Sequence, residues 1–503
     1  MTEHETRPAV QGLVAGAAPA DEDARLADFG YTQRLDRSIG PLASFAIGFA
    51  TISATTAVFT GFGAGFTSAG APFVWTLLIA GAVFAVWTTI AADLAAKIPL
   101  AGYSYQWTSR INGPNLGWFT GSIAVIGWIC GMTGVGYIFA GYLAGLFGLE
   151  TNQTTQILIA IGVVALCALI NIYGVRFATM VNNTGVALEL VLTVLGTLVV
   201  AVVAFSAPDR HQPLSTLFTP GGSGEQASYA LAWLAAALGP FFGLIGVESS
   251  ADVAEETKRS RHVVPRAMMY ALGASIVVEL LMYIVYVLAI RDEAAVLANS
   301  SAPIETIIDQ QLGPVATKIV VAIALTNILA CLLANMLVAT RLVYSMSRDN
   351  MLPFSAAWRR VSPRTLTPTA AVVGLGSLST LMLLSALVNE EAFTYIIGVA
   401  SLAFFAVYTL QTIGLLIGVR KGTIPAAEAG TFDLGRFRTP LYLLALAVFL
   451  TVAGALILLP EFAGNGWVFL GIVVVCALWW ATALRARLRA GEAGAGYAGK
   501  HTS

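Results

Sequence analysis

Residues 237–254 read ALGPFFGLIGVESSADVA, and this stretch decides the fold. It lies in an apolar run of about 25 residues, long enough for a helix to cross roughly 30 Å of hydrocarbon. Yet the run contains a Gly-Pro pair, two further glycines and Glu248. Proline removes an amide donor and glycine weakens a helix, so we expect free backbone groups here. In lipid such groups persist only around a cavity or a ligand, which predicts a site within this span.

A second interrupted run lies near the start of the chain, where residues 44–66 read SFAIGFATISATTAVFTGFGAGF. For one such run, close packing of helices through small residues is an equally good explanation. Two such runs, each opening a five-span half of the chain, are typical of inverted-repeat transporters with broken helices at the membrane midplane. Amide ends favour a carboxylate and freed carbonyls favour a cation, so a zwitterionic amino acid would satisfy both.

The composition of the whole chain is that of a membrane protein. Of its 503 residues, 57% are apolar and only 11% are charged, against roughly 25% charged in a soluble domain. Charges are confined to short stretches between apolar runs, which gives no support for nucleic-acid binding. The four cysteines each lie singly in an apolar run and are predicted to be small core residues, neither disulfides nor metal ligands.

A length of about 20 apolar residues per span predicts about twelve helical spans and an all-α membrane fold. The predicted spans are Leu42–Phe66, Phe73–Ala96, Leu116–Phe147, Thr155–Tyr173, Asn182–Ser206, Tyr229–Val253, Ala267–Ile290, Val315–Tyr344, Thr369–Leu387, Phe393–Val419, Leu441–Leu459 and Trp467–Leu484. With this count, every lysine and arginine except Arg210, Arg291 and Lys318 falls on one side of the membrane. Positive charge accumulates in cytosolic loops, so we expect an integral plasma-membrane protein with both chain ends in the cytosol.

The predicted organisation is a ten-span core with flanking segments. Residues 1–40 mix acids with Ala, Gly and Pro and are expected to form a flexible cytosolic tail. The core covers residues 41–419, with a first repeat at 41–206 and a second at 228–419. Two additional spans follow at 438–486, and residues 487–503 are expected to form a short cytosolic tail.

Three separated segments resemble signatures of the amino acid–polyamine–organocation (APC) superfamily. They are IAADLAAKIPLAGYSYQW (90–107), GVESSADVAEETKRSRHVVPRAM (246–268) and RLVYSMSRDNMLP (341–353). With a glutamate at position 189 in span five, the chain looks most like the amino acid/choline transporter branch. Asp93 stands where a glutamate is common, Tyr103 replaces a glycine, and Thr340-Arg341 replaces Ser-Arg. None of these departures lies in the expected substrate site, so they bear on the branch more than on the superfamily.

The resemblance implies a LeuT-type core of two inverted five-span repeats plus two extra helices, working by alternating access. By matching position, the substrate carboxylate would meet the span-one backbone at Ser53, Ala54, Thr55 and Thr56. The substrate amine would meet the span-six backbone at Phe242, Gly243 and Leu244, next to Gly246. Phe242 takes a position where the superfamily often has an aromatic gate, with ordinary core packing as the alternative.

Three acidic residues lie inside predicted spans without a basic partner, namely Glu189, Glu248 and Glu279. Each must be protonated, bind a cation or face a wet cavity, or else tie two helices together as a neutral carboxyl group. Glu189 lies where several proton-coupled relatives carry a lysine that substitutes for a bound sodium ion. We therefore expect Glu189 to tune coupling, Glu248 to link the span-six break to gating, and Glu279 to be the most structural of the three.

The sequence thus predicts a secondary active transporter of amino acids or related amines. Choline, polyamines and 4-aminobutyrate remain alternative substrates, and a channel or a non-transporting solute sensor is a less favoured class. No motif such as HExxH or GxSxG occurs and the four histidines lie outside the predicted spans, so we expect no enzymatic activity, metal or cofactor. A proton or a sodium ion is the expected coupling ion, and the oligomeric state stays open.

Overall fold

The computed structural model describes residues 19–150, 152–220, 228–299, 302–387, 392–459 and 464–497. Within these ranges the structure is all-helical, with one isolated bridge between Ile39 and Thr257. Ten helical segments are long and apolar enough to cross a membrane. Two shorter apolar segments, Tyr229–Gly243 and Thr369–Ser385, fill the remaining predicted positions. The prediction of an all-α fold with about twelve spans is confirmed.

The first five spans form seven α-helices and two shorter elements. These are α2 (Pro41–Ile52), α3 (Ala54–Ala69), η1 (Ala71–Trp75), α4 (Thr76–Lys97), α6 (Pro114–Phe147), α7 (Gln153–Ile172), α8 (Val175–Leu188), η2 (Glu189–Thr193) and α9 (Val194–Ala204). The next five spans are α10 (Tyr229–Ala236) with α11 (Leu238–Gly243) and α12 (Ser249–Asp252), then α13 (Ser260–Leu288), α16 (Pro314–Arg348), α18 (Thr369–Ser385) and α19 (Ala392–Lys421). The last two are α20 (Arg438–Leu458) and α21 (Asn465–Trp479) with η9 (Trp480–Leu484).

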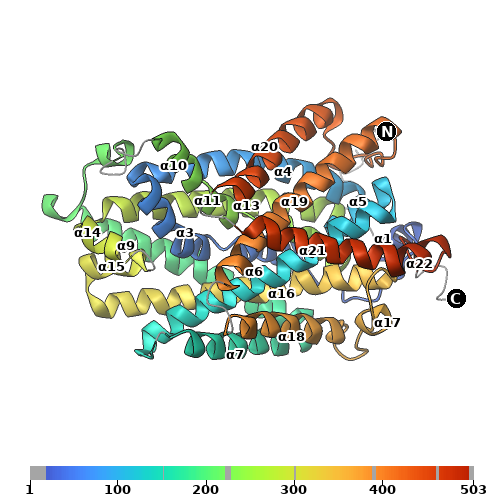
Figure 1. Ribbon diagram of the computed structural model, residues 1–503, viewed down its shortest axis with the longest axis horizontal. Helices are drawn as coiled ribbons and strands as arrows, with labels where there is room; N and C mark the ends of the chain where they lie inside the picture. Colours follow the sequence, from blue (N-terminus) through green and yellow to red (C-terminus); the bar gives the residue numbers. More distant parts are fainter. Residues whose placement is uncertain are drawn as a thin grey trace, which may run out of the picture.

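Short helices connect the spans. They are α1 (Pro19–Asp28), α5 (Tyr103–Asn112), α14 (Glu293–Ala298), α15 (Pro303–Leu312), α17 (Ser355–Trp358) and α22 (Arg485–Arg489), with single turns η3 (Pro208–Arg210), η4 (Leu214–Phe218), η6 (Ala254–Glu256) and η7 (Gly435–Phe437). Figure 1 shows the long helices side by side along one axis, with α1, α17 and α22 at one end and α14 and α15 at the other. We call the end with α1, α17 and α22 the terminal face.

The three cations that the sequence places apart from all others lie at the end opposite the terminal face. The Gln311 side chain at the end of α15 donates to the backbone oxygens of Arg210 and Ala289, at 2.6 and 2.7 Å. Arg291 follows Ala289 closely, and Lys318 lies in the first turns of α16, directly after α15. The charge asymmetry read from the sequence therefore corresponds to two opposite ends of one bundle.

The first span lies at the centre of the bundle and the last two at its edge. Within the described residues, the apolar window of Pro41–Ala69 is 83% buried, against 28% for Gly435–Leu458 and 11% for Asn465–Arg489. Helix α13 packs against α2 and α4, and α6 packs against α16 and α19. Because lipid can solvate the outer apolar side chains, only the central helices must satisfy their polar groups internally.

The two predicted breaks are present, and of the glycines that suggested them only Gly246 lies in a break. In span one the glycines lie inside α3, and the chain leaves the helix at Ser53. In span six Pro240 is the third residue of α11, where a missing amide donor costs little. The helix ends only after Gly243, and five residues separate it from α12.

Both chain ends are packed onto the terminal face where they are described, which differs from the flexible tails that the sequence predicts. Tyr31, Leu35 and Ile39 are buried, and the Tyr31 hydroxyl donates to both carboxylate oxygens of Asp349 at 2.8 Å. The backbone amide of Gly494 donates to the Asp349 carbonyl at 2.9 Å. Residues 1–18 and 498–503 lie outside the described residues.

Candidate functional site

The break in span one is a single residue, Ser53. It has φ 47° and ψ 87°, a left-handed conformation that is uncommon for a residue other than glycine. Its Oγ caps α3 by accepting the amide of Thr56 at 3.4 Å and lies 2.8 Å from the Thr56 hydroxyl. The amide end of α3, which carries a partial positive charge, is thus presented in the middle of the bundle.

Glu189 lies at this amide end. Its Oε1 accepts hydrogen bonds from the Thr55 amide at 3.1 Å and from the Ser53 hydroxyl at 3.2 Å. Glu189 begins η2, a π-helical turn inside span five, and such turns often mark functional sites. The Thr55 amide, which the sequence assigns to the substrate carboxylate, is therefore bonded to a carboxylate of the protein itself.

Three further polar residues complete this cluster, and sequence reasoning did not single them out. The Asn327 amide on α16 donates to the hydroxyls of Thr55 and Thr193, at 3.1 and 3.0 Å. Those two hydroxyls lie 3.0 Å apart. One turn along α16, the Cys331 thiol lies 3.6 Å from the Thr51 carbonyl. The asparagine could have been noticed in the sequence because it lies inside an apolar span, but the sequence does not show which residues it contacts.

The span-six break crosses span one in direct contact. Gly246 has φ 92°, and a Cβ there would lie 2.6 Å from the methyl group of Thr51. A Cβ on Gly243 would lie 2.7 Å from that of Ala57. Only glycine fits at either position without displacing span one, so the structure brings these predicted residues together with the span-one break.

Glu279 on α13 faces the same region from the other side. It is fully buried, and neither of its carboxylate oxygens has a hydrogen-bond partner among the described residues. Its Oε2 lies 3.9 Å from the position of a Cβ on Gly243. Two acidic side chains therefore share this region, one of them with no partner within the described structure.

Glu248 lies in a different environment. Its carboxylate accepts hydrogen bonds from the hydroxyls of Tyr103 and Tyr408, at 2.5 and 2.9 Å, and from the Trp87 indole at 3.2 Å. These donors come from α5, α19 and α4, so Glu248 joins the turn before α12 to three other elements. Asp252, the last residue of α12, is also fully buried and was not singled out from the sequence.

The comparisons with known proteins agree with this architecture. Residues 39–482 match the amino acid permease family. The chain belongs to this family. It is 24% identical over 449 residues to the amino-acid permease BAT1 homolog of Oryza sativa subsp. japonica, which covers 84% of this chain and 85% of the relative. Over 493 residues it is 24% identical to a putative polyamine transporter of Candida albicans, covering 91% of this chain and 86% of the relative. It is 23% identical over 463 residues to the thiamine transporter thi9 of Schizosaccharomyces pombe, covering 84% of this chain and 77% of the relative.

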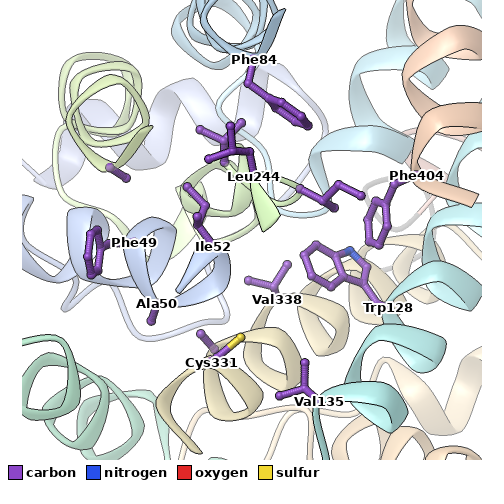
Figure 2. Close-up of a cluster of buried hydrophobic side chains, with 14 of the residues drawn as sticks. Phe49, Ala50, Ile52, Phe84, Trp128, Val135, Leu244, Cys331, Val338 and Phe404 are labelled. Atoms are coloured by element: carbon purple, nitrogen blue, oxygen red, sulfur yellow. The ribbon is translucent and has the colours of Figure 1, made fainter. Parts of the chain in front are cut away.

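The permease is thus a multi-pass membrane transporter of small molecules, and permeases as a family are not enzymes. A cluster of buried apolar side chains lies next to its two breaks. Figure 2 shows Ile52 and Leu244, from spans one and six, around the same centre as Trp128, Val338 and Phe404. The rings of Trp128 and Phe404 pack edge to face, 4.8 Å apart. Phe242, the candidate gate, packs against a small apolar cluster that includes Cys130 of α6 and Ile396 of α19.

The permease is closed at its terminal face by buried ion pairs. Arg341 contacts Glu256 through two hydrogen bonds of 2.7 and 3.0 Å, and Arg348 contacts Glu255 through two of 2.8 Å. These four side chains are almost fully buried. The pairs join the segment after span six to the end of span eight. We call them the terminal latch.

Asp349, directly after α16, extends this latch to the N-terminal segment. It accepts hydrogen bonds from Tyr31 and from Tyr105, both at 2.8 Å. Burial raises the pKa of the Asp349 carboxyl, while the charge of Arg348 and the two tyrosine hydroxyls oppose that rise. Burial also raises the pKa of Tyr31 well above its usual range, so its hydroxyl stays protonated and donates.

Proposed function

We propose that this permease is a secondary active transporter that carries an amine-bearing solute, an amino acid or a related amine, between its two broken spans. One observation carries the proposal: the breaks meet at a region where Glu189 and Glu279 are buried without a basic partner among the described residues. Buried unpaired carboxylates are costly, so the region favours a bound cation. Amino acids, polyamines and thiamine, which the names of the relatives mention, all contain nitrogen groups that can carry positive charge.

The buried apolar cluster next to the breaks indicates the chemical character of the rest of the solute. Ile52, Leu244, Trp128 and Val338 can contact an aliphatic or small apolar portion, but they offer no cation for a second carboxylate. A dicarboxylate would leave an uncompensated negative charge next to Glu189 and Glu279. We therefore expect neutral or cationic solutes with one or more amino groups, and we expect acidic amino acids to be poor substrates.

The position of Glu189 favours a second candidate, a cationic amine that lacks a carboxylate. A zwitterionic amino acid must share the α3 amide end with Glu189 or displace it from the Thr55 amide. A diamine or a quaternary amine needs neither, because the two glutamates provide its counter-charge directly. Trp128 and Phe404 could add cation–π contacts to such a solute.

Matched pairs of solutes test both candidates. Purified protein in proteoliposomes would be offered lysine against cadaverine and ornithine against putrescine, each pair differing only in the carboxylate. Saturable uptake that shows counterflow with either member supports the transporter proposal. A preference for the decarboxylated member supports the second candidate, and a preference for the amino acid excludes it. Best uptake of glutamate or aspartate would contradict both.

For the transport cycle, we propose that the terminal face is cytosolic and that opening toward the cytosol requires the terminal latch to separate. All but three of the lysines and arginines belong to this side by sequence, which favours a cytosolic location in the plasma membrane. Labelling of single cysteines introduced at α14 and α22 with a membrane-impermeant thiol reagent would test it, with α14 reacting from outside intact cells. Labelling of α22 instead would reverse the orientation.

A further inference from the structure

A basin lined by arginines lies on the terminal face, away from the two breaks. It has a volume of about 860 Å³ and lies between residues 30–34, the end of α16 and the loop from α17 to α18. Its lining includes the four arginines Arg34, Arg348, Arg359 and Arg360. Among the residues that the structure describes, no aspartate or glutamate lines it.

Three of these arginines form no ion pair within the part of the chain that the structure describes. Arg348 is paired with Glu255, but Arg34, Arg359 and Arg360 form no ion pair with any described residue. Guanidinium groups gathered in a concave surface repel one another and raise the local concentration of anions. The excess of lysine and arginine in cytosolic loops accounts for positive charge on this face, but it does not require several arginines to line one basin.

A second basin on the same face provides a contrast. Its volume is about 430 Å³, and its lining includes several arginines together with Glu22, Glu255 and Glu428. There three of the four arginines form ion pairs, among them Arg37 with Glu22 at 3.5 Å and Arg261 with Glu428 at 2.8 Å. Each basin is lined by four arginines, but three of those in the larger basin and one in the smaller, Arg259, form no ion pair with a described residue.

We propose that the larger basin binds an anion that carries a phosphate group, held by Arg34, Arg359 and Arg360. Three unpaired guanidinium groups suit a multivalent anion better than a single carboxylate, and the arginine fork matches phosphate oxygens in pairs. The volume falls in the range of small-molecule sites, so the basin is large enough for a ligand bigger than inorganic phosphate. The phosphate belongs either to a soluble metabolite or to the headgroup of an anionic lipid.

The ligand would hold the terminal face closed. Arg34 lies on the N-terminal segment, whereas Arg359 and Arg360 lie on the loop after span eight, so one anion bridges the two segments. The basin wall also includes Tyr31 and Arg348, and the Arg348 guanidinium lies 3.5 Å above the Tyr31 ring. A ligand shifts an equilibrium only if it binds one state more tightly, and separation of these segments would break the basin. This consequence rests on the proposed transport cycle, but binding itself does not.

Binding can be measured without transport. The full chain, purified in a neutral detergent, would be heated with pyrophosphate or with sodium chloride at equal ionic strength. In a second arm it would be placed in nanodiscs of phosphatidylcholine with or without phosphatidylglycerol. We expect pyrophosphate or phosphatidylglycerol to raise the melting temperature of the wild type. The arm that responds identifies the source of the phosphate.

The variants decide whether the basin is the site. Arg359→Gln with Arg360→Gln, and Arg34→Gln alone, should each weaken the apparent affinity about tenfold or more, since each removes charge-assisted hydrogen bonds. Arg364→Gln is the matched control, because Arg364 is an exposed arginine of the same loop that does not line the basin. If the double variant does not fold, the comparison of Arg34→Gln with Arg364→Gln tests the proposal. Equal responses of Arg34→Gln and Arg364→Gln, or no response of the wild type in either arm, would overturn the proposal.

Discussion

Glu248 and Glu279 are both fully buried carboxyl groups in the interior of a membrane protein, yet their surroundings are opposite. Glu248 accepts hydrogen bonds from two tyrosines and a tryptophan, whereas neither oxygen of Glu279 has a partner among the described residues. A fully satisfied buried group stabilises the arrangement around it, and an unsatisfied one is costly unless something else binds it. From this difference we infer a structural role for Glu248 and a ligand-binding role for Glu279.

This inference differs from the expectation drawn from the sequence, in which Glu279 is the most structural of the three acids. The difference comes from the neighbouring side chains, whose positions the sequence does not give. Glu279 lies next to Gly243 of the span-six break, so a solute bound at that break would contact it directly. Glu248 is held in place by α4, α5 and α19, and its role in gating would pass through those contacts.

The largest effect is expected for Gly243→Val, which fills the space next to Glu279. A Cβ at this position would already lie 2.7 Å from that of Ala57, so a valine must push span six away from α3. We expect uptake to be abolished while the protein still reaches the membrane. Gly131→Val is the matched control, because a Cβ on Gly131 would meet no heavy atom within 4 Å. Uptake with unchanged affinity in Gly243→Val would show that the solute does not bind at the span-six break.

A large loss of stability is expected for Glu248→Ala. The change leaves the donors of Trp87, Tyr103 and Tyr408 without their acceptor, and each orphaned buried donor costs about 1 kcal/mol or more. The free energy of unfolding should fall by about 3 kcal/mol. Glu248→Gln keeps one acceptor oxygen and should lie between the alanine variant and the wild type. A melting temperature of Glu248→Ala equal to that of the wild type would show that Glu248 does not stabilise the structure.

The sequence sufficed for the spans because hydropathy and length are local properties. The two broken spans were also readable, since Gly246 and Ser53 belong to runs whose polar and small residues have no place in a plain membrane helix. The exact site of each break was not readable. The site of a break depends on which freed backbone groups can form other hydrogen bonds. Ser53 can leave the helix because the Glu189 carboxylate accepts a hydrogen bond from the freed amide of Thr55.

The partners of buried polar groups could not be read from the sequence. Tyr103 and Tyr408 lie 145 and 160 positions from Glu248, and Arg348 lies 93 positions from Glu255. No periodicity connects residues at such separations, because only the packing of whole helices decides which side chains meet. For the same reason Tyr31 appeared to belong to a tail, although its partner Asp349 lies 318 positions away.

Glu279→Gln should have the opposite effect to the Glu248 variants. Because no described hydrogen bond is lost and the nearly isosteric amide carries no charge that would need a partner, we expect a melting temperature equal to or above that of the wild type. Uptake of the preferred amine should fall about tenfold, since one counter-charge to the substrate is missing. Melting temperature and uptake would be measured on the same preparation. A fall in melting temperature as large as that of Glu248→Gln would show that Glu279 has a structural partner.

A small effect on stability, but the most informative change in ion coupling, is expected for Glu189→Gln. Glu189 stands between the two extremes: its Oε1 accepts from Ser53 and Thr55, and its Oε2 has no partner within the described structure. Glutamine keeps an acceptor oxygen for the α3 amide end, so the span-one break should keep its geometry. The side chain, however, can no longer exchange a proton or offer a negative charge to a cation.

The readout for Glu189→Gln is therefore uptake measured against pH and against sodium concentration in proteoliposomes. If Glu189 carries the coupled proton, the variant should lose the pH dependence of the wild type and keep any sodium dependence. If Glu189 helps to bind a sodium ion, the sodium dependence should weaken instead. If the variant keeps both dependences of the wild type, Glu189 serves only as the acceptor at the α3 amide end. It would then belong with Glu248 among the structural carboxylates, and Glu279 alone would remain as the charged contact for the solute.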